Sequence, residues 1–218
     1  PDIMDTLQIG TEQGGFLVSV YAFAAAITSF MLGPLSDRIG RKALLVHGLA
    51  VFAVSTALCG TAWDYVSLLI FRTCTGAAAG TLSLAITGFI GDYFPYERRG
   101  KVMGIVMSGY FAAMIIGVPM GAIIASATSW RMVFYIFGAI AALLWIPQWR
   151  VIPLLKPSDT STRSFTRSLA DYRRFLGQRG PAIAIIASFF ISASTVGFIT
   201  YVGTWLRDVY ALSTDRIG

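Results

Sequence analysis

A charged stretch, Gly33 to Leu45, lies between two apolar runs that are each long enough to cross a bilayer. It reads GPLSDRIGRKALL, and its four charges are Asp37, Arg38, Arg41 and Lys42. Such polar groups cannot sit in hydrocarbon, where each unsatisfied group carries a large free-energy penalty. We therefore predict a short turn at a membrane face, with a membrane span on either side of it.

The composition also indicates a protein that crosses the membrane several times. Of the 218 residues, 56% are hydrophobic and 13% are charged, whereas soluble domains contain about 25% charged residues. The two cysteines and the single histidine all fall within apolar runs, so they indicate no disulfide framework, metal site or catalytic triad. We expect an all-α integral membrane protein and no enzymatic activity.

Six spans are predicted from runs of about 20 residues with few or no charges, the length that crosses a bilayer. An acidic segment at 1–14 precedes them and is interpreted as a non-cytoplasmic loop. A second basic turn, GDYFPYERRGK, is predicted at 91–101. The spans are predicted at 15–36, 43–63, 65–91, within 102–130, at 132–152 and at 182–206.

Lysine and arginine are divided unevenly between the connecting segments. The segments 36–42, 91–101 and 150–180 hold 3, 3 and 7 of them, whereas the opposite side holds only Arg131, Arg207 and Arg216. The positive-inside rule then places the basic segments in the cytoplasm and both ends of the chain outside. The net charge of +6 is thus a topology signal, and we expect the inner (cytoplasmic) membrane.

Three parts are predicted along the chain: a half-bundle at 1–152, a cytoplasmic linker at 153–180, and a span with its following loop at 181–218. Apolar residues at helical spacing in the linker indicate either a basic amphipathic helix on the inner leaflet or a solvated tether. Residues 3–15 also align without gaps with residues 206–218. Transporters built from two similar halves carry such repeats, so we expect the chain to begin just after the first helix of one repeat.

The motifs resemble those of the major facilitator superfamily. FRTCTGAAAG at 71–80 is similar to the helix-four pattern, and GVPMGA at 117–122 to the helix-five signature of drug and sugar exporters, with its proline one place later than in strict antiporters. The charged stretch is similar to the signature between helices two and three, matching at Gly33, Leu35, Asp37, Arg38, Gly40, Arg41, Lys42 and Leu45. The resemblance implies a helical bundle of that superfamily, covering helices two to seven of twelve and lacking the first.

A conformational latch at the cytoplasmic face is implied by this resemblance. In this latch, Asp37 contacts the N-terminus of a helix in the other half of the transporter, where a carboxylate is favoured by about 0.3 to 1 kcal/mol. The arginines of the charged stretch pair with Asp92. The alternative is that the basic residues only determine topology. The implied latch residues are Gly33, Asp37, Arg38, Gly40, Arg41, Lys42 and Asp92.

Arg72 is the one charge placed within a span. Burying a guanidinium there costs about 2.5 to 3.5 kcal/mol, so such a residue usually faces a water-filled cavity or a partner, although it can also snorkel to the surface. Thr75 and Ser83 follow on its helix face and are predicted to line a substrate cavity with it. The family plan adds Thr195, Phe198 and Tyr201 of the last span to this wall.

Two pairs of small residues are predicted to let helices approach closely. They are Gly76 with Gly80 and Gly117 with Gly121. Pro119, inside the second pair, is predicted to create a bend that a rocking half-bundle needs.

The function implied by the resemblance is secondary active transport by alternating access, with proton-coupled efflux of drugs or small organic solutes. A sugar or nucleoside efflux carrier is the alternative within transport, and a non-transporting membrane sensor on the same scaffold is the alternative from another class. We expect no cofactor and a proton gradient as the energy source. The expected partners are lipid, solute and protons, with no nucleic acid, and the full-length protein is expected to be a monomer.

Overall fold

The computed structural model describes residues 2–153 and 177–210, and regular structure in this part is helical. The side chains of Asp37, Arg38 and Tyr201 are among those that are not described. The chain divides into two compact units, residues 1–162 and 163–218, which are treated separately below. The all-α membrane fold expected from the sequence is confirmed for the described residues.

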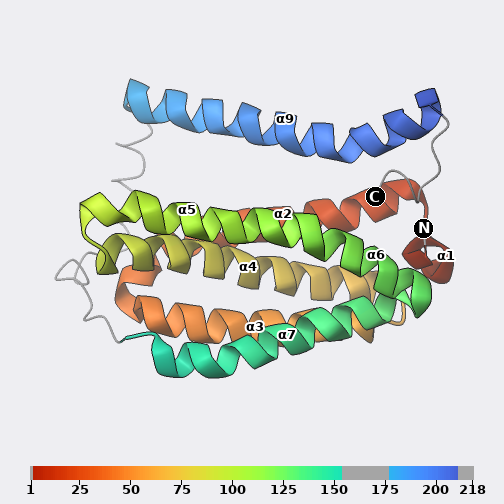
Figure 1. The fold of residues 1–218 in the computed structure, drawn as a ribbon, viewed down its shortest axis with the longest axis horizontal. Coiled ribbons are helices and arrows are strands. Elements are labelled where there is room, and N and C mark those ends of the chain that lie inside the picture. The colour runs from red at the N-terminus through yellow and green to blue at the C-terminus, as the bar shows by residue number, and fades with distance from the viewer. Residues whose placement is uncertain (1, 154–176, 211–218) are drawn as a thin grey trace. The chain divides into compact units, whose positions relative to one another are not determined.

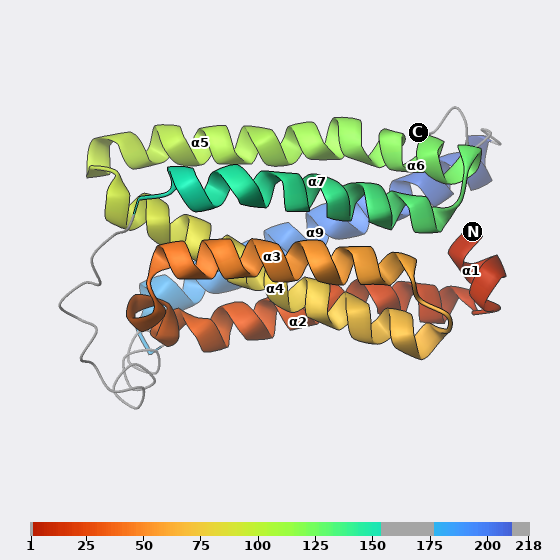
Figure 2. The same cartoon turned by 90° about the horizontal axis from the view of Figure 1, so that it is seen from below.

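The first unit is a bundle in which successive long helices run in opposite directions (Figure 1). Figure 2 shows the α2–α3 and α4–α5 connections at one end of the bundle and the α3–α4 and α6–α7 connections at the other. The elements are α1 (Asp2–Leu7), α2 (Thr11–Ile39), α3 (Arg41–Gly60), α4 (Tyr65–Tyr93), α5 (Tyr96–Ala112), the π-helical turn η1 (Ala113–Gly117), α6 (Val118–Ala127) and α7 (Trp130–Val151).

Five helices in this unit are long and apolar enough to cross a membrane, with α5, η1 and α6 counting as one. They correspond to the first five predicted spans. The sixth predicted span lies within α9 (Arg179–Tyr210), the described helix of the second unit. The predicted linker helix lies largely outside the described residues, and so does the second copy of the terminal repeat.

The predicted turn at Gly33–Leu45 is much shorter than expected. Helix α2 continues to Ile39 and α3 begins at Arg41, so only Gly40 separates them. Gly40 has φ +88°, a left-handed value that a residue with a Cβ reaches only at a steric cost. The predicted short turn is present, but the helices on either side extend further into it, because a helix that leaves hydrocarbon keeps its backbone hydrogen bonds and does not have to end at the interface.

The second basic turn is shortened in the same way. Helix α4 ends at Tyr93 and α5 begins at Tyr96, with only Phe94 and Pro95 between them. A proline disfavours helical backbone in the residue before it and is well tolerated just ahead of a new helix, which fixes the position of this break. The basic residues predicted for the turn therefore belong to the first turns of α5.

The acidic segment at 1–14 was predicted as a loop, and this was wrong: it contains α1 and the first turn of α2. Ile3, Leu7 and Ile9 pack against a buried cluster that includes Leu68 and Trp130. The Trp130 indole also donates a hydrogen bond from Nε1 to Thr6 Oγ1 at 3.2 Å. The prediction considered only the charge of this segment and therefore missed the apolar residues that hold it to the bundle.

Within the bundle, α4 packs against both α2 and α3, and α3 also packs against α7. The contact between α2 and α4 depends on two glycines. A Cβ added to Gly76 would lie 2.3 Å from the Tyr21 carbonyl oxygen, and one added to Gly80 would lie 2.2 Å from that of Ala25. Ser29 donates a hydrogen bond to the Gly80 carbonyl oxygen at 2.9 Å, so α2 and α4 touch backbone to backbone.

The connection between α3 and α4 ends in a capped helix start. The Asp64 side chain accepts a hydrogen bond from the Ser67 backbone N–H at 2.8 Å, and Ser67 Oγ accepts one from the Asp64 backbone N–H at 3.2 Å. This reciprocal arrangement satisfies two backbone donors that the helix leaves unpaired. Hydrogen bonding from the Ser67 side chain and from its backbone N–H lowers the pKa of Asp64 below its ordinary value.

Candidate functional site

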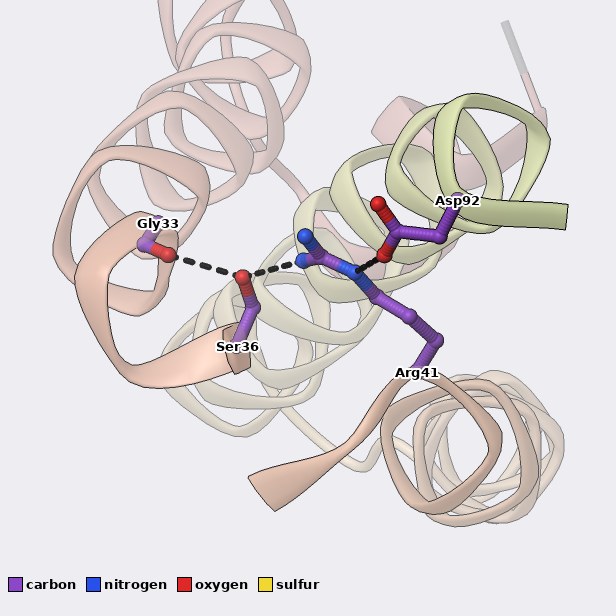
Figure 3. A network of polar contacts seen from close by, with 4 residues as sticks. All are labelled: Gly33, Ser36, Arg41 and Asp92. Atoms are coloured by element: carbon purple, nitrogen blue, oxygen red, sulfur yellow. Dashed lines mark hydrogen bonds and ion pairs between the residues drawn. The ribbon is translucent and has the colours of Figure 1, made fainter. Parts of the chain in front are cut away.

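One arginine joins three helix ends at the end of the bundle where α2 meets α3 (Figure 3). Arg41 donates from Nε to Asp92 Oδ2 at 2.8 Å, forming an ion pair with the last turn of α4. Its Nη1 donates to Ser36 Oγ, which in turn donates to the Gly33 carbonyl oxygen at 2.7 Å. The end of α2, the start of α3 and the end of α4 are thereby held by a single guanidinium group.

Gly88 makes room for this guanidinium. A Cβ at Gly88 would lie 2.6 Å from Cζ of Arg41 and 2.7 Å from its Nε. Gly88 and Asp92 are four residues apart, so they share one face of α4. Nothing in the sequence singles out Gly88, because it belongs to neither glycine pair and its partner lies 47 residues away in the chain.

The structure brings only part of the predicted latch together. Gly33, Arg41 and Asp92 are in the network, and Gly40 forms the break between the helices. Lys42 is half-buried, and the side chains of Asp37 and Arg38 lie outside the described set. The contact of Asp37 with another half of the protein therefore stays a prediction.

Asp92→Asn is expected to lower the thermal stability of the protein by a few degrees. The Asp92 side chain is 50% exposed, and ion pairs with that much solvent contribute about 0.2 to 1 kcal/mol. Unfolding of the detergent-solubilised protein, followed by tryptophan fluorescence, measures the change. Glu97→Gln, which removes an exposed acid from the first turn of α5, is the control. Equal melting temperatures for Asp92→Asn and the unchanged protein would contradict a stabilising role for the pair.

A cavity of about 450 Å³ lies inside the bundle around Arg72 and Thr75. It is lined by residues of α1, α2, α3, α4, α6 and α7. The wall is mainly aromatic and aliphatic with a few polar groups, a composition typical of small-molecule sites. Its lining side chains include Tyr21, Phe52, Thr56, Cys59, Trp130, Val133, Phe134 and Phe137.

Arg72 is held on the cavity wall by an aromatic ring. Its guanidinium carbon lies 4.7 Å from the centroid of the Phe134 ring, within the range of a cation–π contact. Among the described residues no carboxylate pairs with Arg72, whereas Arg131 donates to the Gly60 and Ala62 carbonyl oxygens at 3.0 and 2.5 Å. Within the described part of the chain, Arg72 therefore presents to the cavity a positive charge that no carboxylate offsets.

Thr75 also lies on the wall, but its hydroxyl is already engaged. It donates to the Phe71 carbonyl oxygen at 2.8 Å, and the Cys59 sulfur lies 3.8 Å from its Oγ1. Ser83 is exposed on α4 and is not among the residues that line this cavity. In the second unit, Thr195 and Phe198 are exposed. With Tyr201, whose side chain is not described, they remain predicted cavity residues.

A family model described as Major Facilitator Superfamily matches residues 1–218. The chain belongs to the Major Facilitator Superfamily. This finding confirms the resemblance inferred from the charged stretch and from the helix-four and helix-five motifs. The chain is therefore part of a multi-pass membrane protein of that superfamily.

Similar curated superfamily members include the "Uncharacterized MFS-type transporter YceJ" of Bacillus subtilis (strain 168), 31% identical over 100% of this chain and 55% of that protein. A "Hexuronate transporter" of the same organism is 29% identical over 92% of this chain and 46% of that protein. A "Probable sugar efflux transporter" of Helicobacter pylori (strain P12) is 26% identical over 97% of this chain and 54% of that protein. The chain thus spans about half the length of these superfamily relatives.

A solved superfamily structure supports the same fold. It is the crystal structure of a bacterial homolog to the human lysosomal transporter Spinster, in an inward-facing and unoccupied conformation. The TM-score is 0.65 at 20% sequence identity, and the match covers 97% of this chain and 51% of that structure. At this identity the likeness shows the fold alone, namely a fragment of the Major Facilitator Superfamily bundle.

In this superfamily member, the helix formed by α5, η1 and α6 changes direction between α5 and α6 (Figure 1), and Pro119 is the second residue of α6. Pro119 has no N–H to donate to the preceding turn, and the π-helical turn η1 ends at Gly117, directly before α6. Single π-helical turns often occur at functional sites. A Cβ at Gly117 would meet nothing within 4 Å, and one at Gly121 would lie 3.8 Å from Val133. The described residues therefore form no close packing through this pair.

Proposed function

We propose that the full-length protein is a secondary active transporter of the inner membrane that moves a small organic solute by alternating access. The observation that carries the proposal is the charge of Arg72 on the wall of a cavity, where no carboxylate of the described residues pairs with it. A charge inside a membrane bundle is costly and usually marks a substrate or ion pathway. Superfamily membership supports the general class of the activity.

We further propose that a proton gradient drives efflux, that no cofactor takes part, and that the full-length protein acts as a monomer. No Asp or Glu lies in the middle of a span of this chain. A carboxylate that binds and releases the driving proton would therefore come from a part of the full-length protein outside these residues. The proposed solutes are drugs or other small organic molecules.

Sugar or sugar-acid efflux is the second candidate. It is favoured by relatives whose names describe a hexuronate transporter and a probable sugar efflux transporter. The helix-five motif, with its displaced proline, points in the same direction.

Transport by the full-length protein in proteoliposomes tests the proposal. An imposed pH gradient is expected to drive accumulation of at least one solute from a panel of cationic drugs, neutral sugars and sugar acids. Accumulation should collapse when a protonophore removes the gradient. A non-transporting sensor would bind a solute without any flux, and that result would contradict the proposal.

The latch at the cytoplasmic end gives a separate prediction. Asp37→Ala is expected to increase the fraction of molecules open to the cytoplasm, because a lost contact of about 1 kcal/mol changes a two-state population about fivefold. Labelling of a single cysteine placed in the cytoplasmic part of the path measures this fraction. Glu97→Gln serves as the control, and labelling that is equal in Asp37→Ala and the unchanged protein would exclude the latch.

A further inference from the structure

Thr56 carries a buried hydroxyl that has no hydrogen-bond partner among the described residues. The residue lies in the last two turns of α3, is 7% exposed and lines the cavity that contains Arg72. Buried hydroxyls usually find a partner, and in apolar helices they commonly donate to the carbonyl oxygen four residues earlier. Ser55 does so with Val51 at 2.7 Å, and Thr75 does so with Phe71 at 2.8 Å.

The cavity therefore presents two polar groups, from two different helices, that have no hydrogen-bonding or oppositely charged partner among the described residues. Arg72 of α4 supplies a positive charge with no carboxylate partner in the described part of the chain, and Thr56 of α3 supplies a hydroxyl that can donate or accept a hydrogen bond. The remaining wall is largely apolar. At about 450 Å³, the cavity falls within the range of about 300 to 1,000 Å³ typical of small-molecule sites.

We propose that this cavity binds a hydroxylated organic anion and that Thr56 is a specificity-determining residue that hydrogen-bonds one of its hydroxyl groups. The anionic group of the solute lies at Arg72. A cationic solute is disfavoured because its charge would be repelled by the like charge of Arg72. A solute without hydroxyl groups would leave Thr56 unpaired. The inference rests on the proposed transport function and assigns its substrate class.

The assignment gives α3 a role in solute recognition that the helix-four motif does not reveal. A buried polar group built to bond a substrate hydroxyl discriminates strongly against analogues that lack it, because the group is then left without a partner. Arg72 selects for charge and Thr56 for a hydroxyl. The two selections can therefore be measured separately.

Binding of three six-membered-ring probes to the full-length protein tests the proposal. Glucuronate has a carboxylate and hydroxyls, cyclohexanecarboxylate has the carboxylate alone, and glucose has hydroxyls alone. Isothermal titration measures each affinity for the unchanged protein and for Thr56→Val, Thr56→Ser and Ser55→Ala. Valine has the shape of threonine without the hydroxyl, whereas Ser55→Ala removes a neighbouring hydroxyl that is bonded within its own helix.

We expect glucuronate to bind most tightly and glucose at least tenfold more weakly. Thr56→Val should weaken glucuronate binding about tenfold and leave cyclohexanecarboxylate within about twofold. Thr56→Ser should keep most of the affinity for glucuronate, and Ser55→Ala should change neither probe. The melting temperature of Thr56→Val should be equal or higher, since the substitution removes a buried unpaired hydroxyl.

Several results would overturn the inference. Equal affinity for glucose and glucuronate would exclude an anionic substrate class. Failure of all three probes to bind would exclude it as well. Unchanged glucuronate affinity in Thr56→Val would show that a water or another segment of the protein satisfies the hydroxyl. If Thr56→Val weakens the binding of glucuronate and of cyclohexanecarboxylate equally, the role of Thr56 is structural. Failure of solute flux in proteoliposomes with the binding pattern intact would contradict the transport proposal alone.

Discussion

Gly80→Ala is expected to destabilise the bundle strongly. The added Cβ would lie 2.2 Å from the Ala25 carbonyl oxygen, and that atom is backbone, so relief requires α2 and α4 to separate. Overpacking a core costs about 1 to 3 kcal/mol and occasionally more, and a clash with backbone belongs at the upper end. A loss of about 3 kcal/mol lowers the ratio of folded to unfolded protein more than a hundredfold.

Three glycines on α4 make this prediction quantitative. A Cβ at Gly80 meets backbone, one at Gly88 meets the movable side chain of Arg41, and one at Gly91 meets nothing within 4 Å. The melting temperature should fall most in Gly80→Ala and less in Gly88→Ala. Gly91→Ala should be neutral or stabilising, since alanine favours a helix over glycine by about 1 kcal/mol. Size-exclusion profiles and thermal unfolding of the three variants measure the series. A Gly80→Ala protein as stable as Gly91→Ala would contradict the close contact of α2 and α4.

Arg72→Leu is expected to abolish transport while leaving the protein folded and inserted. Hydrogen bonds to a charged group contribute about 1.5 to 3 kcal/mol. Loss of the proposed bond between Arg72 and the solute should therefore reduce solute flux by about ten- to a hundredfold or more. The same change removes a costly buried charge. The melting temperature should therefore stay equal or rise.

Arg131→Leu provides the opposite case. Arg131 bonds the carbonyl oxygens of Gly60 and Ala62 at the end of α3, so its loss should destabilise the protein. Flux per folded molecule, measured beside thermal unfolding, separates the two arginines. Retained flux in Arg72→Leu would make Arg72 a packing residue and would remove the observation on which the proposed function rests.

The sequence predicted the number and order of the first five spans because long uncharged runs have few alternatives in a bilayer. It misplaced the helix ends because charge marks the membrane boundary but not the end of a helix. Gly40, with its positive φ, marks the end between α2 and α3. In α1, the apolar residues Ile3 and Leu7 are too few to stand out in a hydropathy profile, although they find partners in the folded bundle.

The candidate site was predicted only where a residue is unusual in its own segment. Arg72 is conspicuous as a charge within a span, and Arg41 and Asp92 belong to recognisable motifs. The sequence does not distinguish Thr56, Gly88 or Phe134, whose ring lies against Arg72, because these residue types are common in apolar helices. Only the packing of α3 against both α4 and α7 gives them a role, and contacts between helices far apart in the sequence are not encoded in local patterns.

Access to the Arg72 cavity from the two sides of the membrane tests the central claim most directly. Val133 lines the cavity, so Val133→Cys in a full-length protein lacking its other cysteines can report on access, with an impermeant thiol reagent added to right-side-out or inside-out vesicles. The account predicts labelling from both sides, and a shift toward the cytoplasmic side when Asp37→Ala is added. Labelling from one side only, unchanged by Asp37→Ala, would contradict an alternating-access transporter with Arg72 in its solute path.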